Sequence, residues 1–274
     1  MKNYSAKNDF KFGWVSLLVT GAMVLGSGAV NLAFANPHTT ILKKNTPSKY
    51  AVREELEGTS SVINHVRIPH GCNGTDIRAM SLVFPNGNTT AVATDNNESV
   101  DLVDHIEGSP VSDIGAVQDK NIFRHIAEVE ANGPFGENVR AIHYTNGKLD
   151  AHHVGLVPWN SNFPKFKEGS CATSLKVNIA IANYCTRSRT AENRADIWIG
   201  HLTELFNDPA VVSQSPPNFW PHLIVVRDQE NNPLAPECGE GFGIEVSPSD
   251  EDIDAYLPIR RYWPFPQSNG GADE

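Results

Sequence analysis

Short apolar runs separated by turn-forming residues dominate the chain. They are rich in Val, Ile and aromatic residues, which is typical of β-strands. The clearest runs are Ser61–Ile68, Arg78–Pro85, Val139–Tyr144, His153–Val157, Leu175–Ala182, Asp196–Gly200, His222–Arg227 and Gly243–Val246. Within one of them, Val177, Ile179 and Ile181 recur with a period of two, so we expect them to share a buried face. Many short strands between frequent turns predict an all-β fold, a β-sandwich with long loops.

Two local patterns add to this prediction. Asn146-Gly147 lies between two expected strands and favours a tight hairpin turn. Helical periodicity is weak along the chain, and only residues 119–131 favour a short helix or a turn.

The N-terminus is typical of an export signal. Lys2, Lys7 and Lys11 precede an apolar run over residues 14–32, and Ala33-Phe34-Ala35 has the small-x-small spacing of a cleavage site. We expect a signal peptide over residues 1–35, a loose N-terminal arm over 36–58, one sandwich domain over 59–265 and a disordered tail over 266–274. The alternative is an uncleaved membrane anchor, because the run is long enough to span a bilayer. After cleavage no membrane span is expected.

Net charge excludes one class of partner. The 274 residues carry 22 Lys and Arg against 32 Asp and Glu, a net charge of −10. Nucleic-acid binding needs a basic surface, so we expect no nucleic-acid partner.

Four cysteines, Cys72, Cys171, Cys185 and Cys238, suit an oxidising compartment outside the cytoplasm. Their even number predicts two disulfides, and sequence alone allows three pairings. Cys171 with Cys185 would close a short loop, so that pairing, with Cys72 joined to Cys238, is preferred. A zinc site is disfavoured because no short Cys-x2-Cys spacing is present.

Histidine is the residue type that points to chemistry. Ten are present, and imidazole is the commonest metal ligand at neutral pH. No nucleotide-binding glycine loop and no G-x-S-x-G or H-E-x-x-H motif accompanies them. Three places combine histidine with a tryptophan or a second histidine: Trp220 with His222, Trp198 with His201, and His152-His153. If one strand carries both Trp220 and His222, they lie on one face.

Several segments resemble the copper-repressible copper-binding surface proteins of methane-oxidising bacteria, the CorA and MopE group. The segments are Arg67–Gly74, Arg194–Trp198 and Phe219–His222. The Pro69-His70-Gly71-Cys72 stretch also resembles YcnI-like copper-binding β-sandwich domains. The resemblance implies a single Cu(I) held by two histidines and an oxidised tryptophan. Trp220 and His222 match that local pattern, and the second histidine is expected among His153, His201 and His70.

Calcium is a second metal known in the resembled family. Alternating oxygen ligands over Asp95–Asp101 are spaced as in calcium loops, but the glycine and the bidentate glutamate of such loops are missing. A second acidic cluster contains Asp250, Glu251, Asp252 and Asp254. The alternative for both is a solvated acidic surface.

These observations predict an exported copper-binding protein without enzymatic activity, secreted, attached to the cell surface or periplasmic. It would capture copper for acquisition, storage or homeostasis, with an outer-surface or periplasmic partner protein. One alternative is a histidine-brace copper monooxygenase, which needs histidine as the first residue; cleavage after Ala35 leaves Asn36 first and His38 third. The other is a metal-free adhesion or carbohydrate-contacting sandwich, for which exposed tryptophans would serve, but Trp159, Trp198, Trp220 and Trp263 are too dispersed along the chain to indicate a platform.

Overall fold

The computed structural model confirms the all-β prediction. It describes residues 38–41, 51–54, 61–72, 74–185, 194–212 and 220–263. The expected signal peptide and C-terminal tail lie outside these residues. Strands dominate the described chain, and α1 (Asp250–Tyr256) is its one α-helix. Within the described ranges, no helix is both long and apolar enough to cross a membrane.

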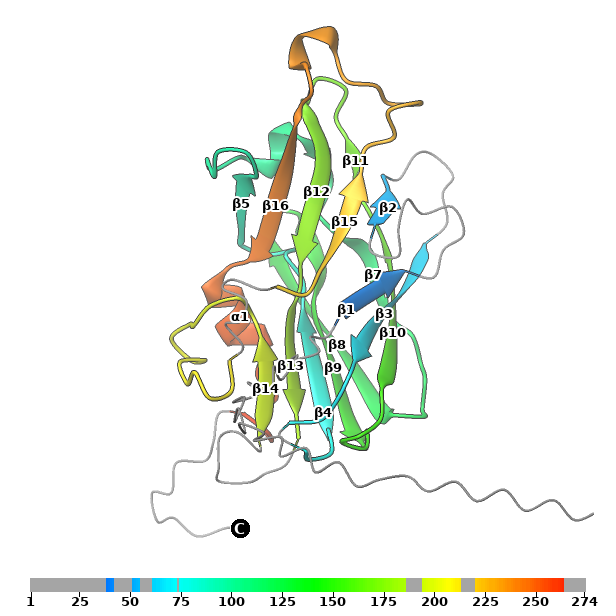
Figure 1. Cartoon of the computed structure of the whole chain (residues 1–274), viewed down its shortest axis with the longest axis vertical. Helices are drawn as coiled ribbons and strands as arrows, with labels where there is room; N and C mark the ends of the chain where they lie inside the picture. Colours follow the sequence, from blue (N-terminus) through cyan, green and yellow to red (C-terminus); the bar gives the residue numbers. More distant parts are fainter. Residues whose placement is uncertain are drawn as a thin grey trace, which may run out of the picture. The chain divides into compact units, whose positions relative to one another are not determined.

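One five-stranded sheet forms the lower half of the view in Figure 1. Its order is β14 (Ala195–Trp198), β13 (Ala180–Tyr184), β4 (Ala79–Val83), β9 (Gly136–Gly147) and β8 (Phe123–Gly133). Every residue of β4 and β13 is buried. These central strands are covered on both faces, which explains why their sequences are nearly continuous apolar runs rather than alternating ones.

A second five-stranded sheet lies above it in Figure 1, in the order β2 (Ala51–Arg53), β15 (His222–Val226), β12 (Ala172–Asn178), β16 (Phe242–Pro248) and β5 (Thr89–Ala93). β15 and β16 alternate buried and half-buried residues, as strands do when one face is covered. The chain passes from β12 in this sheet to β13 in the other through Ile179. Val177, Ile179 and Ile181 all enter the same core, as predicted.

A four-stranded sheet in the order β1 (His38–Ile41), β3 (Val62–Ile68), β10 (Gly155–Asn162) and β7 (Ser112–Ala116) completes the sandwich. A short ribbon pairs β11 (Lys165–Phe166) with β6 (Ile106–Glu107). The expected N-terminal arm, residues 36–58, contributes β1 and β2, which pair with β3 and β15. The sheets therefore begin before residue 59.

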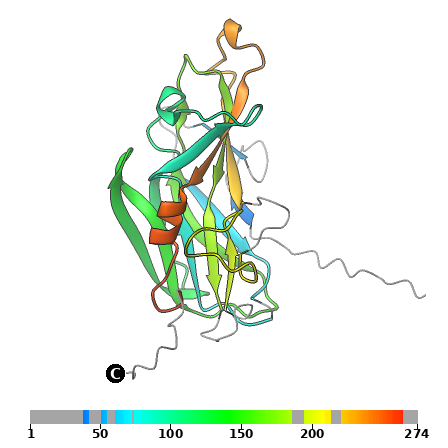
Figure 2. The ribbon, with the colours of Figure 1, turned by 90° about the vertical axis from the view of Figure 1, so that its left-hand side faces the viewer.

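Two apolar cores hold the sheets together. The larger core joins the three larger sheets and includes Trp159, Leu175 and Ile142. The smaller core lies on the opposite face of the β4-containing sheet. On that face, α1, the segment after β14 and Trp220 pack against the sheet. Figure 2 shows the orange-red α1 beside the green β8–β9 hairpin.

Two local predictions are wrong. Residues 119–131 contain most of β8 instead of a helix. Asn146 and Gly147 end β9, and the next strand, β10, belongs to another sheet, so they form no hairpin turn. Asn146 does adopt a left-handed conformation, with φ of 52°, because asparagine tolerates it.

The two disulfides are present, but the preferred pairing is wrong. Cys72 bonds to Cys185, and Cys171 bonds to Cys238. The first bond links the end of β3 to the end of β13, and both its cysteines are buried in the larger core. The second links the start of β12 to the turn before β16. Two disulfides are typical of a protein in an oxidising, extracellular or periplasmic environment.

Candidate metal centre

Trp220 is the anchor of the candidate site. It is buried in the smaller core, with 6% of its surface exposed. The edge of its indole lies on Gly200, where an added Cβ would come within 2.3 Å of Trp220 Nε1. Gly200 has a φ of 73°, so its position needs glycine for the backbone as well as for the contact.

The predicted geometry for Trp220 and His222 is wrong in one respect. β15 begins at His222, so Trp220 precedes the strand, and the strand period does not place the two side chains on one face. Pro221 explains this, because proline has no N–H for the strand ladder and is tolerated at strand starts.

His201 approaches Trp220 from the segment that follows β14. The ring centroids are 5.6 Å apart, with an interplanar angle of 61°. His201 Nε2 lies 2.6 Å from Asp250 Oδ1, on the first residue of α1. A carboxylate on one imidazole nitrogen orients the ring and leaves the other nitrogen for a metal, which is the usual arrangement around metal-ligating histidines.

His222 meets the backbone of the same tryptophan. Its Nδ1 lies 2.9 Å from the Trp220 carbonyl oxygen, which can only accept, so Nδ1 donates. Burial lowers the pKa of His222 below its usual value, although the Trp220 carbonyl acts in the opposite direction. The ring is therefore neutral at pH 7, the form that binds metals.

The surroundings of His222 are polar and balanced in charge. Lys176 Nζ forms an ion pair with Glu245 Oε1 at 2.9 Å, and Asn178 Nδ2 donates to the same carboxylate oxygen at 2.8 Å. Lys176 lowers and Glu245 raises the pKa of His222, so both charges lie near the ring. Because they form a pair, they add little net repulsion toward a cation.

Two predicted ligands, His70 and His153, make no described contact with Trp220. His153 is exposed on the turn after Asp150, whose carbonyl accepts its backbone N–H. His70 is half-buried beside the Cys72–Cys185 disulfide, with Nδ1 lying 2.9 Å from the Gly71 carbonyl oxygen. The five predicted residues thus divide into a group of three around Trp220 and two separate histidines.

A carboxylate that the sequence did not single out, that of Asp196, lies within electrostatic reach of His70. Asp196, on β14, is half-buried, and burial raises its pKa to about 6. The Trp198 side chain and the charge of His70 act against that rise. Asp196 lies directly opposite Asn183 on β13. Asp196 belongs to the segment Arg194–Trp198, which resembles the CorA and MopE group. That resemblance was the sequence feature that could have pointed to this carboxylate.

Neither calcium candidate gathers its oxygen atoms. The carboxylates of Asp250 and Asp254 bond to His201 and Thr203, while Glu251 accepts from Asn88. In the other cluster, Glu98 contacts Asn96 and Asp101 caps the turn at Val103. Among the described residues, no three His, Cys, Asp or Glu side chains come together as a metal-binding group.

Comparison with known proteins gives no family. No protein-family model matches the chain, and no curated protein matches it.

Proposed function

We propose that this chain is an exported copper-binding protein that holds Cu(I) beside Trp220, with His201 and His222 as ligands. The observation that carries the proposal is the convergence of two histidines on one buried tryptophan, one against its ring and one against its carbonyl. The resemblance to the CorA and MopE group requires two histidines and a tryptophan, and these three residues supply that set.

Each histidine has a distinct role in this proposal. His201 would bind through Nδ1, since Asp250 holds Nε2. His222 would bind through Nε2, since Nδ1 donates to the Trp220 carbonyl. Trp220, intact or oxidised, would shield the ion from water and contribute contacts from its buried ring.

The donor set favours Cu(I) over other ions. Imidazole suits copper, zinc and iron, but structural zinc takes four ligands. Calcium takes six or more oxygen atoms. Cu(I) accepts a low coordination number, so two imidazoles are sufficient, and the described chain offers no larger cluster near Trp220.

The proposed location is outside the cytoplasm, secreted, on the cell surface or in the periplasm. Support comes from the two disulfides and from the export signal expected over residues 1–35. Copper captured there would pass to an outer-surface or periplasmic partner protein. N-terminal sequencing of the exported chain should find Asn36 first, whereas a chain that begins at His38 would favour the histidine-brace alternative.

Copper content tests the proposal. The exported protein should be loaded with Cu(I) under anaerobic, reducing conditions and analysed by elemental mass spectrometry. We expect about one copper ion per chain, and a loss of at least tenfold in Cu(I) affinity against a competing chelator for His201→Ala and for His222→Ala.

A matched control separates the site from general histidine binding. His125 is exposed on β8, away from Trp220, so His125→Ala should keep full copper binding. Full copper retention in both His201→Ala and His222→Ala would refute the proposed ligands. A mass change confined to the Trp220 peptide after copper exposure would indicate oxidation of the tryptophan.

A further inference from the structure

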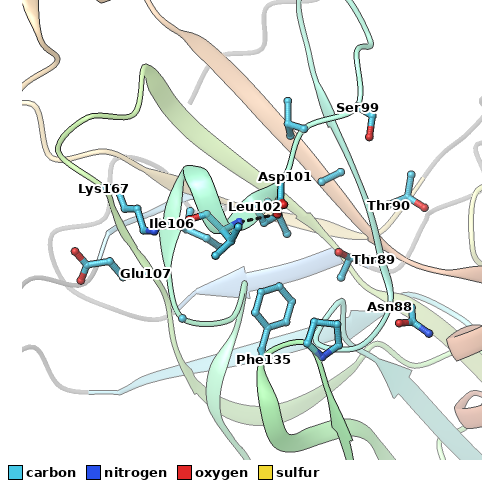
Figure 3. Close-up of a pocket in the computed structure, with 15 residues that line it drawn as sticks. Asn88, Thr89, Thr90, Ser99, Asp101, Leu102, Ile106, Glu107, Phe135 and Lys167 are labelled. Atoms are coloured by element: carbon cyan, nitrogen blue, oxygen red, sulfur yellow. Dashed lines mark hydrogen bonds between the residues drawn. The ribbon is translucent and has the colours of Figure 1, made fainter.

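A large open pocket lies at the far edge of the second sheet, beside β5. Its volume is about 1020 Å³, the upper end for small-molecule sites. It lies between the β5 edge, the turn at Leu102–Asp104 and the tip of the β8–β9 hairpin (Figure 3). We propose that this pocket binds a neutral oligosaccharide. The proposal does not depend on the copper site.

The walls of the pocket combine an aromatic surface with hydroxyl groups. Pro134 and Phe135 form the hairpin turn, and the Phe135 ring is half-buried against the larger core with one side toward the pocket. Thr89 projects its side chain toward the same space (Figure 3). The hydroxyls of Thr89, Thr90 and Ser99 have no hydrogen-bond partner in the described part of the chain. Hydroxyls both donate and accept, as sugar hydroxyls do.

The lining carries no unbalanced charge for an ionic ligand. Glu107 lies 3.9 Å from Lys165 Nζ. Lys167 donates to the Val103 carbonyl at 2.5 Å, and Asp101 accepts from the Val103 N–H at 3.1 Å. The charges of Lys167 and Asp101 cancel, and both are used to hold the turn. A phosphate or a carboxylate would therefore find no spare cation here.

The β5 edge is too short to accept a peptide strand. Backbone groups of Thr89 and Ala91 point away from β16 and toward the pocket, because Asn88 and Thr94 bond to the β16 side. Val100 N–H already donates to the Ala91 carbonyl, and Ala93 N–H donates to Glu98. At this edge only the backbone N–H and C=O groups of Thr89 and the N–H of Ala91 remain for a ligand. Strand addition uses more backbone groups than these. They suffice for hydrogen bonds to a sugar ring.

The proposal is tested by titration of the full chain with three neutral saccharides, maltotriose, cellotriose and triacetylchitotriose. Binding is followed by calorimetry and by ligand-observed NMR. We expect one of these probes to bind. Phe135→Leu keeps an apolar side chain for the core but removes the stacking surface, and should weaken binding by about five- to tenfold. Phe135→Trp should preserve or strengthen it. Thr89→Val should weaken binding by about fivefold through loss of the hydroxyl.

Two control variants test whether a loss of sugar binding is specific to this pocket. Thr94→Val makes the same change just after β5 at an exposed residue outside the pocket, and should leave affinity unchanged. His222→Ala should also leave sugar binding unchanged, so a failed copper proposal and a failed sugar proposal can be told apart. The proposal is overturned if none of the saccharides binds at millimolar concentration, if binding survives Phe135→Leu intact, or if a short peptide binds in their place.

Discussion

The contact between Gly200 and Trp220 sets the geometry of the candidate metal centre at the residue scale. Replacement of Gly200 by alanine would place a Cβ 2.3 Å from Trp220 Nε1, at a φ of 73°. Strain in the backbone and overpacking both disfavour the folded state. We expect Gly200→Ala to lower the free energy of unfolding by about 1–3 kcal/mol and to weaken copper binding, as measured by urea unfolding and chelator competition.

A second glycine serves as the matched control for this prediction. Gly169 has no atom within 4 Å of an added Cβ and no positive φ. Gly169→Ala should therefore change stability by less than about 0.5 kcal/mol. Equal stability for Gly200→Ala and Gly169→Ala would contradict the packing described for Trp220.

Sequence spacing placed Trp220 and His222 of this candidate site together, but for a physical reason it did not show which elements bring His201 to Trp220 and Asp250. Trp220 and His222 stand two residues apart, so their proximity is local. His201 and Asp250 are 49 residues apart and meet only because α1 packs beside the segment after β14. No sequence periodicity encodes such a contact between separate elements. His201 was predicted from its neighbour Trp198, but the tryptophan that it contacts is Trp220.

A buried polar network joins several elements around Arg227, directly after β15. Its five N–H donors lie within hydrogen-bond distance of seven acceptor oxygens, six of them backbone carbonyls and one the Asn232 side chain, so some of these hydrogen bonds are shared. Asn232 Nδ2 in turn donates to both carboxylate oxygens of Glu54, at 3.1 and 2.9 Å. Glu54 also accepts the backbone N–H groups of Phe166 and Asp228. This network links Glu54, the residue after β2, to β11 and to the loop after β15.

Arg227→Lys tests this network. Lysine keeps the charge but has three donors without the planar fork, so it cannot reach carbonyls on several segments at once. Buried acceptors would lose their partners, and we expect a loss of about 2–4 kcal/mol in unfolding free energy. Arg124→Lys, on an exposed residue of β8, should be neutral in the same chemical denaturation. A neutral Arg227→Lys would show that the network adds nothing to stability.

His143 ties α1 to the β4-containing sheet and makes stability depend on pH. Its Nε2 donates to the Tyr256 carbonyl at 2.7 Å. Burial lowers the pKa of His143 below 6.5, while the Tyr256 carbonyl acts to raise it. The folded state therefore binds fewer protons than the unfolded state. Its contribution is complete above pH 6.5 and is lost as pH falls toward the folded pKa.

His143→Gln should remove that dependence, since an amide can donate to the same carbonyl without titrating. Between pH 7.5 and pH 5.5, the wild type should lose about 1 kcal/mol more unfolding free energy than the variant. Half-buried His65, His105 and His222 also have lowered pKa values and titrate in both proteins, so the difference isolates His143. His125→Gln is the control and should follow the wild-type curve. Parallel curves for wild type and His143→Gln would contradict the assignment.

At the element scale, prediction succeeded where a strand has a buried face. The runs around β3, β4, β15 and β16 were recognised because core contacts set their pattern. The prediction failed at β8, because most residues of this strand are exposed or half-buried. Because few core residues pack against β8, its sequence does not alternate apolar and polar residues. Its apolar residues Phe123, Ile126 and Val129 instead recur every three positions, a spacing that resembles a helix.

The fold class of the whole molecule could be predicted because strand length and turn frequency are local properties. Disulfide pairing could not, since it depends on which loop ends meet in space. The short spacing of Cys171 and Cys185 favoured the wrong pair. β12 and β13 carry these two cysteines into different sheets, and each finds its partner near the end of another element.

The two disulfides should stabilise the molecule unequally. Each restricts the unfolded chain, and their sequence separations of 113 and 67 residues predict similar entropic gains of about 4.5 kcal/mol. Cys72 and Cys185 are also buried in the larger core, whereas Cys171 and Cys238 are half-buried. The Cys72→Ala, Cys185→Ala double variant should therefore lose about 1–2 kcal/mol more than the Cys171→Ala, Cys238→Ala variant, because it also leaves a cavity.

Unfolding in urea under non-reducing conditions measures this difference, and both double variants carry the same number of substitutions. Peptide mapping of the unreduced wild type should join the Cys72 peptide to the Cys185 peptide and leave no free thiol. A Cys171–Cys185 linkage in that map would contradict the pairing of the sheets at the ends of β12 and β13. Equal losses in the two variants would mean that the entropy of the unfolded chain alone governs the effect, and that burial of Cys72 and Cys185 adds nothing.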